Sequence, residues 1–284
     1  MKERSAMTMT TATAGVILTA TQVAELLVQP VGEESVAAQL GTIVNTESST
    51  FRMPLVTADP QAEWVSEGDE IAPSDMQFDE EEIAPKKVAG LTFITREAAE
   101  DTSPEAAAAV GAGLARDIAR KVDRAFFSTV ANPKAPRGIG LLPVNATPED
   151  VQGLEVAAWD SLDVFAEAQS KAEGVGAAIT NFVANPADAL ALTTLKVATG
   201  SQQTLLGGAR SINGVPLLVD EEVPAGTIWG IPADRVFIVI REDATVETDR
   251  SVAFTSDRIA VKAIMRVGFG FNHAAALVKV SLTA

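Results

Sequence analysis

One long amphipathic segment, residues 102–130, places the strongest constraint on how this chain can fold. Its apolar side chains recur at intervals of three and four residues, the spacing that puts them on one face of a helix. Thr102 is followed three residues later by Glu105, and Pro104 suits the first helical turn, so together they form a helix start signal. The sequence therefore predicts one long helix at the centre of the fold.

The predicted polar face of this helix carries a row of arginines together with an acid and an aromatic residue: Arg116, Arg120, Asp123, Arg124 and Phe127. We call Arg116, Arg120 and Arg124 the arginine ridge. Like charges four residues apart on a helix repel each other mildly, so the ridge favours an opposite charge beside it. The ridge and Phe127 are predicted to contact another chain. A surface helix that packs only on its own core is the alternative.

A second constraint lies between two predicted strands, 51–57 and 88–95. Residues 58–87 hold ten acidic and two basic side chains, a net charge of −8, which is half of the −16 of the whole chain. Connections longer than about 15 residues inside a compact domain are usually functional or disordered. The segment also holds Trp64 and Phe78, which a purely solvating loop would not need. We predict a two-stranded arm that leaves the body and lies on another molecule.

The contact residues expected on this arm are Trp64, Glu67, Asp69, Glu70, Phe78, Glu80 and Glu81. Their expected partner is the arginine ridge of a neighbouring chain. Exposed ion pairs contribute only ~0–1 kcal/mol each, so the contact must draw on many copies and on the packing of the Trp64 ring.

The composition narrows the class of protein. Of the 284 residues, 47% are hydrophobic and 21% are charged, which suits a globular core, and cysteine is absent. A net charge of −16 argues against a surface that holds nucleic acid tightly. The sequence shows neither a signal peptide nor an apolar stretch of the ~20 residues that cross a bilayer. We expect a soluble protein with no membrane partner.

No constellation of residues points to catalysis. His273 is the one histidine, and there is no nucleophile elbow of the Gly-x-Ser-x-Gly type. The glycine pairs do not match a phosphate-binding loop, and the acidic run 79–82 lacks the spacing of a calcium loop. We therefore expect no enzyme activity, no cofactor and no bound metal.

Helices and strands alternate irregularly over the rest of the chain, which predicts an α+β fold. Helices are expected over 160–173 and 186–198. Strands are expected over 178–184, 214–219, 235–240, 245–248, 258–266 and 275–282.

The order of these parts resembles the HK97-fold major capsid proteins of tailed bacteriophages. The similar stretches are Ala62–Gly68, Pro85–Val88, Ile94–Glu97, Arg137–Ile139, Leu205–Gly207, Val215–Pro216, Pro224–Thr227, Asp243–Glu247 and Arg266–Phe269. The resemblance covers nearly the whole chain from about residue 20 and rests on the ordered set rather than on one motif.

The resemblance implies an HK97-like fold with four parts. These are an N-terminal arm (1–47), an extended β-hairpin loop (48–95), a peripheral domain with the long spine helix (96–144 and 241–284) and an axial domain (145–240).

The implied function is that of a major capsid protein, which self-assembles into an icosahedral phage head around double-stranded DNA. An encapsulin-type nanocompartment shell is the alternative. The implied partners are further copies of the chain in pentamers and hexamers, a separate scaffolding protein, a portal protein and, as an open option, a decoration or cement protein. Packaged DNA is expected to be held without tight specific binding. The implied location is the virion, with assembly in the host cytoplasm.

Some members of this family join a loop lysine to an asparagine of a neighbouring subunit, with a glutamate as proton acceptor. Here no lysine lies between Lys2 and Lys86, and Ile264 and Met265 precede Arg266, where the glutamate would be expected. Asp257 stands where the asparagine would be expected. The resemblance therefore implies a shell without covalent crosslinks.

Overall fold

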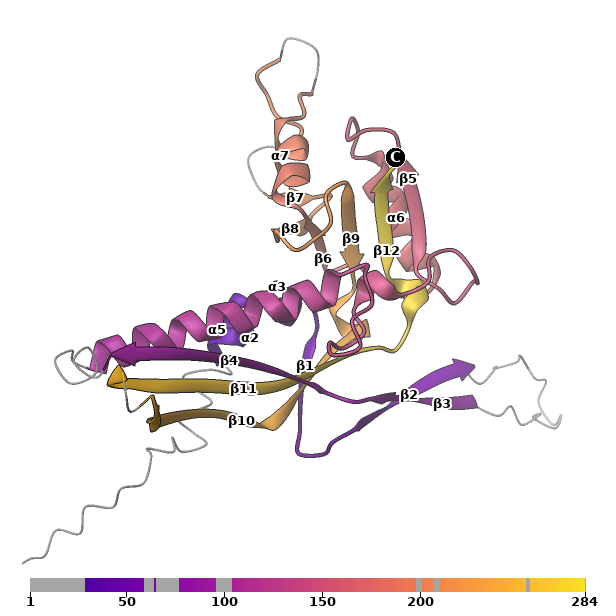
Figure 1. Cartoon of the computed structure of the whole chain (residues 1–284). Coiled ribbons are helices and arrows are strands. Elements are labelled where there is room, and N and C mark those ends of the chain that lie inside the picture. The colour runs from indigo at the N-terminus through magenta and orange to yellow at the C-terminus, as the bar shows by residue number, and fades with distance from the viewer. Residues whose placement is uncertain are drawn as a thin grey trace, which may run out of the picture.

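The computed structural model describes residues 29–58, 64, 77–95, 104–197, 201–206, 210–253 and 256–283. Helix α5 (Pro104–Phe127) crosses one face of a four-stranded sheet, a second sheet stands above the C-terminal part of α5, and a two-stranded hairpin projects from the body (Figure 1). The predicted long helix is confirmed, with Pro104 as its first residue. Thr102 lies outside the described residues.

The four-stranded sheet has the order β1-β10-β11-β4. In that order its strands span Thr42–Thr46, Val236–Ala253, Arg258–Phe271 and Lys86–Thr95. Strand β1 is parallel to β10, and the other neighbours are antiparallel. Side chains alternate between the two faces of a strand, and those that face α5, such as Val88, Val261 and Met265, bury against the helix. This face and α5 form the first hydrophobic core.

The beginning of β10 is buried on both faces. Val236, Ile238 and Ile240 belong to the core beneath α5, whereas Phe237 and Val239 belong to a smaller cluster beneath the hairpin. Burial on both faces explains why this stretch is continuously apolar instead of alternating.

Strands β2 (Phe51–Ala58) and β3 (Gln77–Ile83) pair antiparallel and form the projecting hairpin (Figure 1). The structure thus has a two-stranded arm, but its first strand is the one predicted over 51–57, and only its second strand lies within residues 58–87. The other predicted strand, 88–95, lies in β4 and pairs with β11, because its inward side chains Val88 and Ile94 pack on the core of α5.

The base of the hairpin is fixed on the face of the sheet that lies opposite α5. Met53 and Ile83 are 3% and 5% exposed and form a cluster with Val239. Two glycines of β11 make room for Ile83: a Cβ would lie 2.7 Å from the Ile83 side chain at Gly268 and 2.3 Å from it at Gly270. The hairpin therefore leaves the sheet from a close-packed base.

The second sheet has the order β5-β12-β9-β6-β8-β7. In that order its strands span Gln152–Val156, Val278–Leu282, Thr227–Ile231, Asn181–Ala184, Val215–Val219 and Ser211–Ile212. Helices α6 (Asp163–Gly174) and α7 (Pro186–Thr194) contribute to a separate core with this sheet. The side chain of Asn185 accepts a hydrogen bond from the Ala187 N–H and caps α7, whose first residue is Pro186.

The two sheets are not built from two separate halves of the sequence. Five strands of the second sheet lie within the predicted axial segment, 145–240, whereas β12 comes from the end of the predicted peripheral segment, 241–284. β12 pairs with β5 on one side and β9 on the other. The four predicted domain limits remain predictions.

Shorter elements connect these parts. Two short helices lie beside α5, namely α2 (Gln29–Glu34) and α3 (Val36–Leu40). Single 3-10 turns span Ile139–Leu141, Ala233–Arg235 and Ala274–Ala276.

The buried face of α5 is rotated relative to the predicted one. Its buried side chains are Ala115, Ile118, Ala119, Val122, Asp123, Phe126 and Phe127. Asp123 and Phe127 are 5% and 0% exposed, so their predicted position on the polar face is wrong. Both belong to a buried row spaced by four residues, in which two small alanines and one charged residue precede the phenylalanine and hide the apolar pattern.

Candidate assembly surfaces

The acidic hairpin, by which we mean β2 and β3, presents carboxylates along β3. Asp79, Glu80 and Glu82 are exposed. The Glu80 carboxylate lies 3.6 Å from the Arg52 guanidinium of β2, and both side chains are mostly exposed. Glu81 faces the body, where its carboxylate accepts a hydrogen bond of 3.4 Å from the Phe271 N–H. The exposed carboxylates of Asp79 and Glu82 are therefore accessible to another molecule, whereas that of Glu80 already pairs with Arg52.

The predicted contact residues of the outer arm are described only in part. Trp64 is fully exposed, at 105% of its reference surface. Phe78 pairs with Val56 in the hairpin, but its side chain is outside the described structure. Glu67, Asp69 and Glu70 also lie outside the described residues.

The arginine ridge lies on the exposed side of α5, as predicted. Arg124 Nε is 3.9 Å from the carboxylate of Glu222, in the turn that follows β8. Phe127, which was predicted to lie beside the ridge, is instead buried against Phe126, with ring centroids 5.0 Å apart. Its ring therefore has no surface to offer a neighbouring chain.

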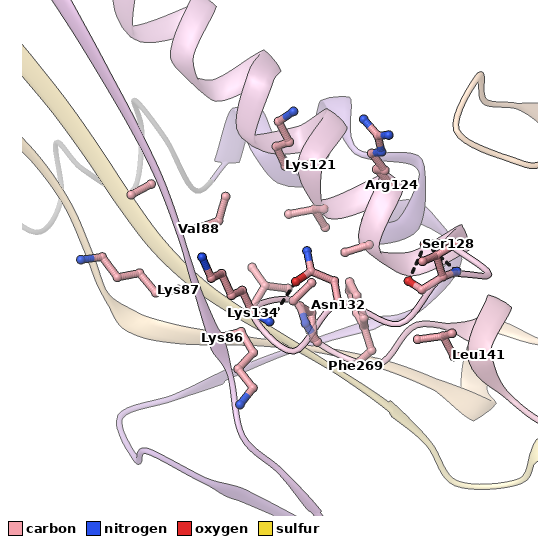
Figure 2. A pocket seen from close by; sticks show the side chains of 17 residues that line it. Lys86, Lys87, Val88, Lys121, Arg124, Ser128, Asn132, Lys134, Leu141 and Phe269 are labelled. Atoms are coloured by element: carbon pink, nitrogen blue, oxygen red, sulfur yellow. Dashed lines mark hydrogen bonds between the residues drawn. The ribbon is translucent and has the colours of Figure 1, made fainter.

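A basic cleft of about 380 Å³ lies between the C-terminal half of α5, the start of β4 and the loop after the helix (Figure 2). Its cationic side chains are Lys86, Lys87, Lys121, Arg124 and Lys134. Its apolar wall includes Val88, Ala125, Val267 and Phe269. No acidic side chain lines this cleft within the described structure. The structure thus brings only Arg124 of the ridge into the cleft, together with four lysines that sequence reasoning did not connect.

The loop that closes the cleft is shaped by local hydrogen bonds. The Ser128 hydroxyl donates to the Val130 carbonyl (3.0 Å) and accepts from the Val130 N–H (3.1 Å). The Asn132 side-chain oxygen accepts from the Lys134 N–H at 3.0 Å (Figure 2). These bonds turn the chain at the end of α5 and place Lys134 on the rim of the cleft.

Two glycines then return the chain against the end of the helix. A Cβ at Gly138 would lie 2.2 Å from the carbonyl oxygen of Ala125, and one at Gly140 would lie 2.4 Å from that of Phe127. Only glycine permits such close approach of backbone to backbone. The Arg137–Ile139 stretch noted in the sequence therefore holds the loop against the C-terminal end of α5.

A buried carboxylate links α5 to the N-terminal segment. Asp123 Oδ1 accepts hydrogen bonds from the Ser35 hydroxyl (2.6 Å) and the Ala37 N–H (2.9 Å), at the start of α3. Burial raises the pKa of Asp123 from its ordinary 3.8 to about 6, against the lowering effect of these hydrogen bonds. Repulsion by Asp220 raises the pKa further. Sequence reasoning placed this residue in solvent and missed the contact.

The outer face of β4 exposes apolar side chains at the edge of its sheet. Leu91 and Phe93 are 59% and 46% exposed, and β4 is the last strand in the sheet order. Exposed apolar side chains on a long edge strand are typical of a surface that another molecule covers.

The described residues also bear on metal binding and on the state of the single histidine. They contain no group of three or more side chains arranged to hold a metal ion. Burial, aided by Arg235, lowers the pKa of His273, which favours the neutral imidazole. Across the same described residues, none of the helices has the length and apolar character needed to cross a membrane.

Known capsid structures are similar to this fold over most of its length. The capsid of an empty GTA particle superimposes with a TM-score of 0.76 at 21% identity, covering 88% of this chain and 90% of that chain. A structure of Mycobacterium phage Adephagia gives 0.70 at 15% identity, covering 88% and 90%. The virus-like particle from Pyrococcus furiosus gives 0.59 at 12% identity, covering 92% and 98%. No curated protein sequence matches the chain.

The Phage capsid family matches residues 15–282, which is nearly the whole sequence. This match confirms the HK97-like capsid fold, and it favours a phage head over the encapsulin-type alternative. The capsid assignment also accounts for the exposed acidic, basic and apolar surfaces described above. The chain belongs to the phage capsid family and is a major capsid protein, a structural component of the virion.

Proposed function

We propose that this capsid protein closes an icosahedral head of pentamers and hexamers by laying its acidic hairpin on a neighbouring subunit. The observation that carries this proposal is the hairpin itself. Its base is packed on the sheet through Met53 and Ile83, while Asp79, Glu80 and Glu82 are exposed along the part that projects. A close-packed base and an exposed acidic strand suit a contact between subunits.

The receiving surface is positively charged and lies near α5 of the neighbour. The arginine ridge is the candidate that the sequence supplies, and the apolar face of β4 with Leu91 and Phe93 is a second contact region. Trp64 adds an exposed ring that would bury in such a contact. Exposed ion pairs contribute ~0–1 kcal/mol each, so stability arises from repetition over the shell.

The remaining partners follow from the same assignment. Assembly takes place in the host cytoplasm with a separate scaffolding protein and a portal protein, and a decoration protein completes the shell where one is present. Packaged double-stranded DNA is held loosely, because a subunit of net charge −16 repels phosphate on average.

The test is assembly of the purified protein, alone and with its scaffolding protein, followed by electron microscopy and sedimentation. Closed shells with five-fold and six-fold capsomers are expected. A protein that stays monomeric under all these conditions would contradict the proposal.

A further inference from the structure

The basic cleft gathers positive charge in an acidic protein. Five of the chain's 22 lysines and arginines line it, although the whole chain carries a net charge of −16. No acidic side chain stands among its described lining residues. Because charge of one sign on a concave surface with an apolar wall raises the local potential, the cleft attracts anions even though the subunit as a whole repels them.

The charge in the cleft is little neutralised from within the subunit. The Arg124 guanidinium lies 3.9 Å from the Glu222 carboxylate, but the Arg124 side chain is 68% exposed. The four lysines of the cleft form no ion pair within the described part of the chain. All four are exposed, so another molecule has access to them.

The subunit's own acidic hairpin does not cover the cleft, because the two lie on opposite faces of the same sheet. Val267 and Phe269 of β11 line the cleft and belong to the core of α5. Gly268 and Gly270, which alternate with them, face Ile83 at the base of the hairpin. From this base the hairpin extends away from the body (Figure 1). The positive charge of the cleft is therefore left for a different molecule.

The cations of the cleft surround it and do not focus on one point. Figure 2 shows Lys121 and Arg124 on α5, Lys86 and Lys87 on β4, and Lys134 on the loop that follows α5, with their charged ends pointing in different directions. A single small anion would need several donors directed at it. Separate charges around a cleft suit instead a long anion whose charges recur at short intervals.

Duplex DNA is such an anion. Its phosphates recur about every 3.4 Å along each strand. Lysine binds phosphate as a point charge without demanding one geometry, and phosphate contacts carry no sequence information. The proposed function places this polymer inside the shell, so the cleft needs no partner beyond those already proposed.

We infer that the basic cleft holds the phosphate backbone of the packaged DNA and therefore opens towards the interior of the head. The inference rests on the proposed function and names the surface by which the shell touches its contents. Lys86, Lys87, Lys121 and Lys134 make the contacts, whereas the net charge of the whole subunit repels the DNA. One weak site per subunit, repeated over the shell, keeps the DNA at the wall and still lets it leave.

Salt-dependent DNA binding tests the inference on unassembled subunits. Fluorescence anisotropy with a labelled duplex of about 20 base pairs, measured from about 20 to about 200 mM NaCl, gives the affinity and its slope against salt concentration. Wild-type subunits should bind weakly, with an affinity that falls as salt rises. Lys121→Gln/Lys134→Gln should weaken binding about ten-fold at the lowest salt and reduce the slope by about 2, because each lost phosphate contact contributes about 0.9.

A matched control removes the same charge elsewhere. Lys196 follows α7 and Arg210 precedes β7, and both are exposed. Lys196→Gln/Arg210→Gln should stay within about two-fold of the wild-type affinity, because these cations lie outside the cleft. Circular dichroism establishes that each variant is folded. Equal DNA binding by the cleft variant and the wild type would overturn the inference, and so would wild-type subunits that show no salt-dependent binding.

Lysine labelling of assembled empty shells tests where the cleft opens. A small acetylating reagent that passes through the shell should modify Lys121 and Lys134, whereas the same reactive group on a polymer too large to enter should not. Mass spectrometry of the digested protein locates the labels, and both reagents should label the unassembled subunit. Labelling by the polymer in shells would place the cleft on the outside, and protection from both reagents would place it between subunits. Either result overturns the inference.

The outcomes separate this inference from the proposed function. Normal wild-type shells together with unchanged DNA binding by the cleft variant would overturn the inference and leave the shell function intact. A wild-type protein that forms no shells would contradict the proposed function, and the inference with it, whatever the isolated subunit binds.

Discussion

The buried charge of Asp123 shows how one residue ties together segments distant in sequence. Its carboxylate accepts from Ser35 and from the Ala37 N–H, so it holds the start of α3 on α5. A buried carboxylate loses hydration, and hydrogen bonds from uncharged donors offset only part of that loss. Asp220, itself buried and with its pKa raised mainly by burial, adds repulsion. At neutral pH this junction is therefore less stable than its hydrogen bonds alone suggest.

Asp123→Asn is expected to stabilise the subunit above pH 6. Because the folded-state pKa of Asp123, about 6, lies above its ordinary 3.8, the folded protein binds this proton more tightly than the unfolded chain. This residue's contribution to the free energy of unfolding rises as pH falls from 7 towards 4, by at most ~3 kcal/mol. The amide keeps an acceptor for Ser35 and Ala37 without the charge. Thermal unfolding from pH 5 to pH 8 should show the variant's advantage growing with pH.

A control separates this effect from other titrating groups. The lowered pKa of His273 acts in the opposite direction as pH falls, so the variant must be compared with the wild type at each pH. Asp117→Asn makes the same substitution on the exposed side of α5, away from Ser35 and Ala37, and shows the effect of the substitution itself. A constant difference between Asp123→Asn and the wild type across the range would contradict the assignment.

At the scale of elements, the acidic hairpin depends on contacts that are distant in sequence. Ile83 occupies the space left by Gly268 and Gly270, and a Cβ at Gly270 would lie 2.3 Å from the end of the Ile83 side chain. The hairpin's own strand pairing cannot fix its direction, because an isolated two-stranded sheet is only marginally stable. The close fit of Ile83 on β11 supplies that fixation.

Gly270→Ala and Ile83→Ala are each expected to loosen the hairpin, and the double variant should recover part of the loss. The first inserts a methyl group where Ile83 lies, and the second leaves a cavity, for which losses of ~2–5 kcal/mol are typical. Because the two residues share one space, their effects should not add. Amide hydrogen exchange of β2 and β3 measures the loosening. Gly113→Ala is the control, because nothing lies within 4 Å of its new Cβ. If the effects of Gly270→Ala and Ile83→Ala on hydrogen exchange were strictly additive, the two residues would not share one space.

The sequence predicts where the helices and strands of this protein lie better than it predicts which strands pair with each other. The long helix, the apolar strand at 235–240 and the start of α7 at Pro186 depend on local spacing, and the structure confirms them. The pairing of β4 with β11 and the joining of β12 to the second sheet are non-local, and no local pattern encodes them. The sequence predicts the long helix correctly, but it assigns the row Ala115, Ala119, Asp123 and Phe127 to the wrong face, because this row is buried in the structure.

The candidate site shows the same limit more strongly. The exposed acids of β3 and the exposed arginine ridge follow from composition and helical spacing. The basic cleft does not, because its cations come from the start of β4, from α5 and from the loop after it, and only folding brings them together. Asp123 was misplaced because a charge in a buried row looks like solvent exposure until its partners at 35 and 37 are known.

At the scale of the whole molecule, the exposed apolar face of β4 predicts a difference between folding and assembly. Leu91→Ser and Phe93→Ser should change the stability of the unassembled subunit by less than ~1 kcal/mol, because both side chains are about half exposed. In the shell the same changes remove apolar surface from a covered contact and should lower the yield several-fold. Leu190→Ser on α7, 65% exposed in the subunit, provides a comparison. Equal shell yields for the wild type and the β4 variants would show that this face stays in solvent.

The charges and geometry of the subunit also predict how its shell is held together. A crosslink between a loop lysine and an asparagine needs a neutral amine and a carboxylate that accepts its proton. Lys86 and Lys87 are the first lysines after Lys2, and both pair with β11 at the start of β4 rather than lying on the projecting hairpin. At the position where the glutamate would be expected, Met265 is buried in the core and Ile264 is its neighbour.

The shell is therefore expected to contain no covalent bonds between subunits. Asp257, in the place of the asparagine, has no amide nitrogen to release as ammonia when a lysine attacks, so formation of the isopeptide bond lacks its usual leaving group. Mature particles boiled in detergent and run on a denaturing gel should give one band at 29.6 kDa. A ladder of covalent oligomers would refute this expectation. A single band would mean that non-covalent contacts between subunits, or an added cementing protein, hold the head together.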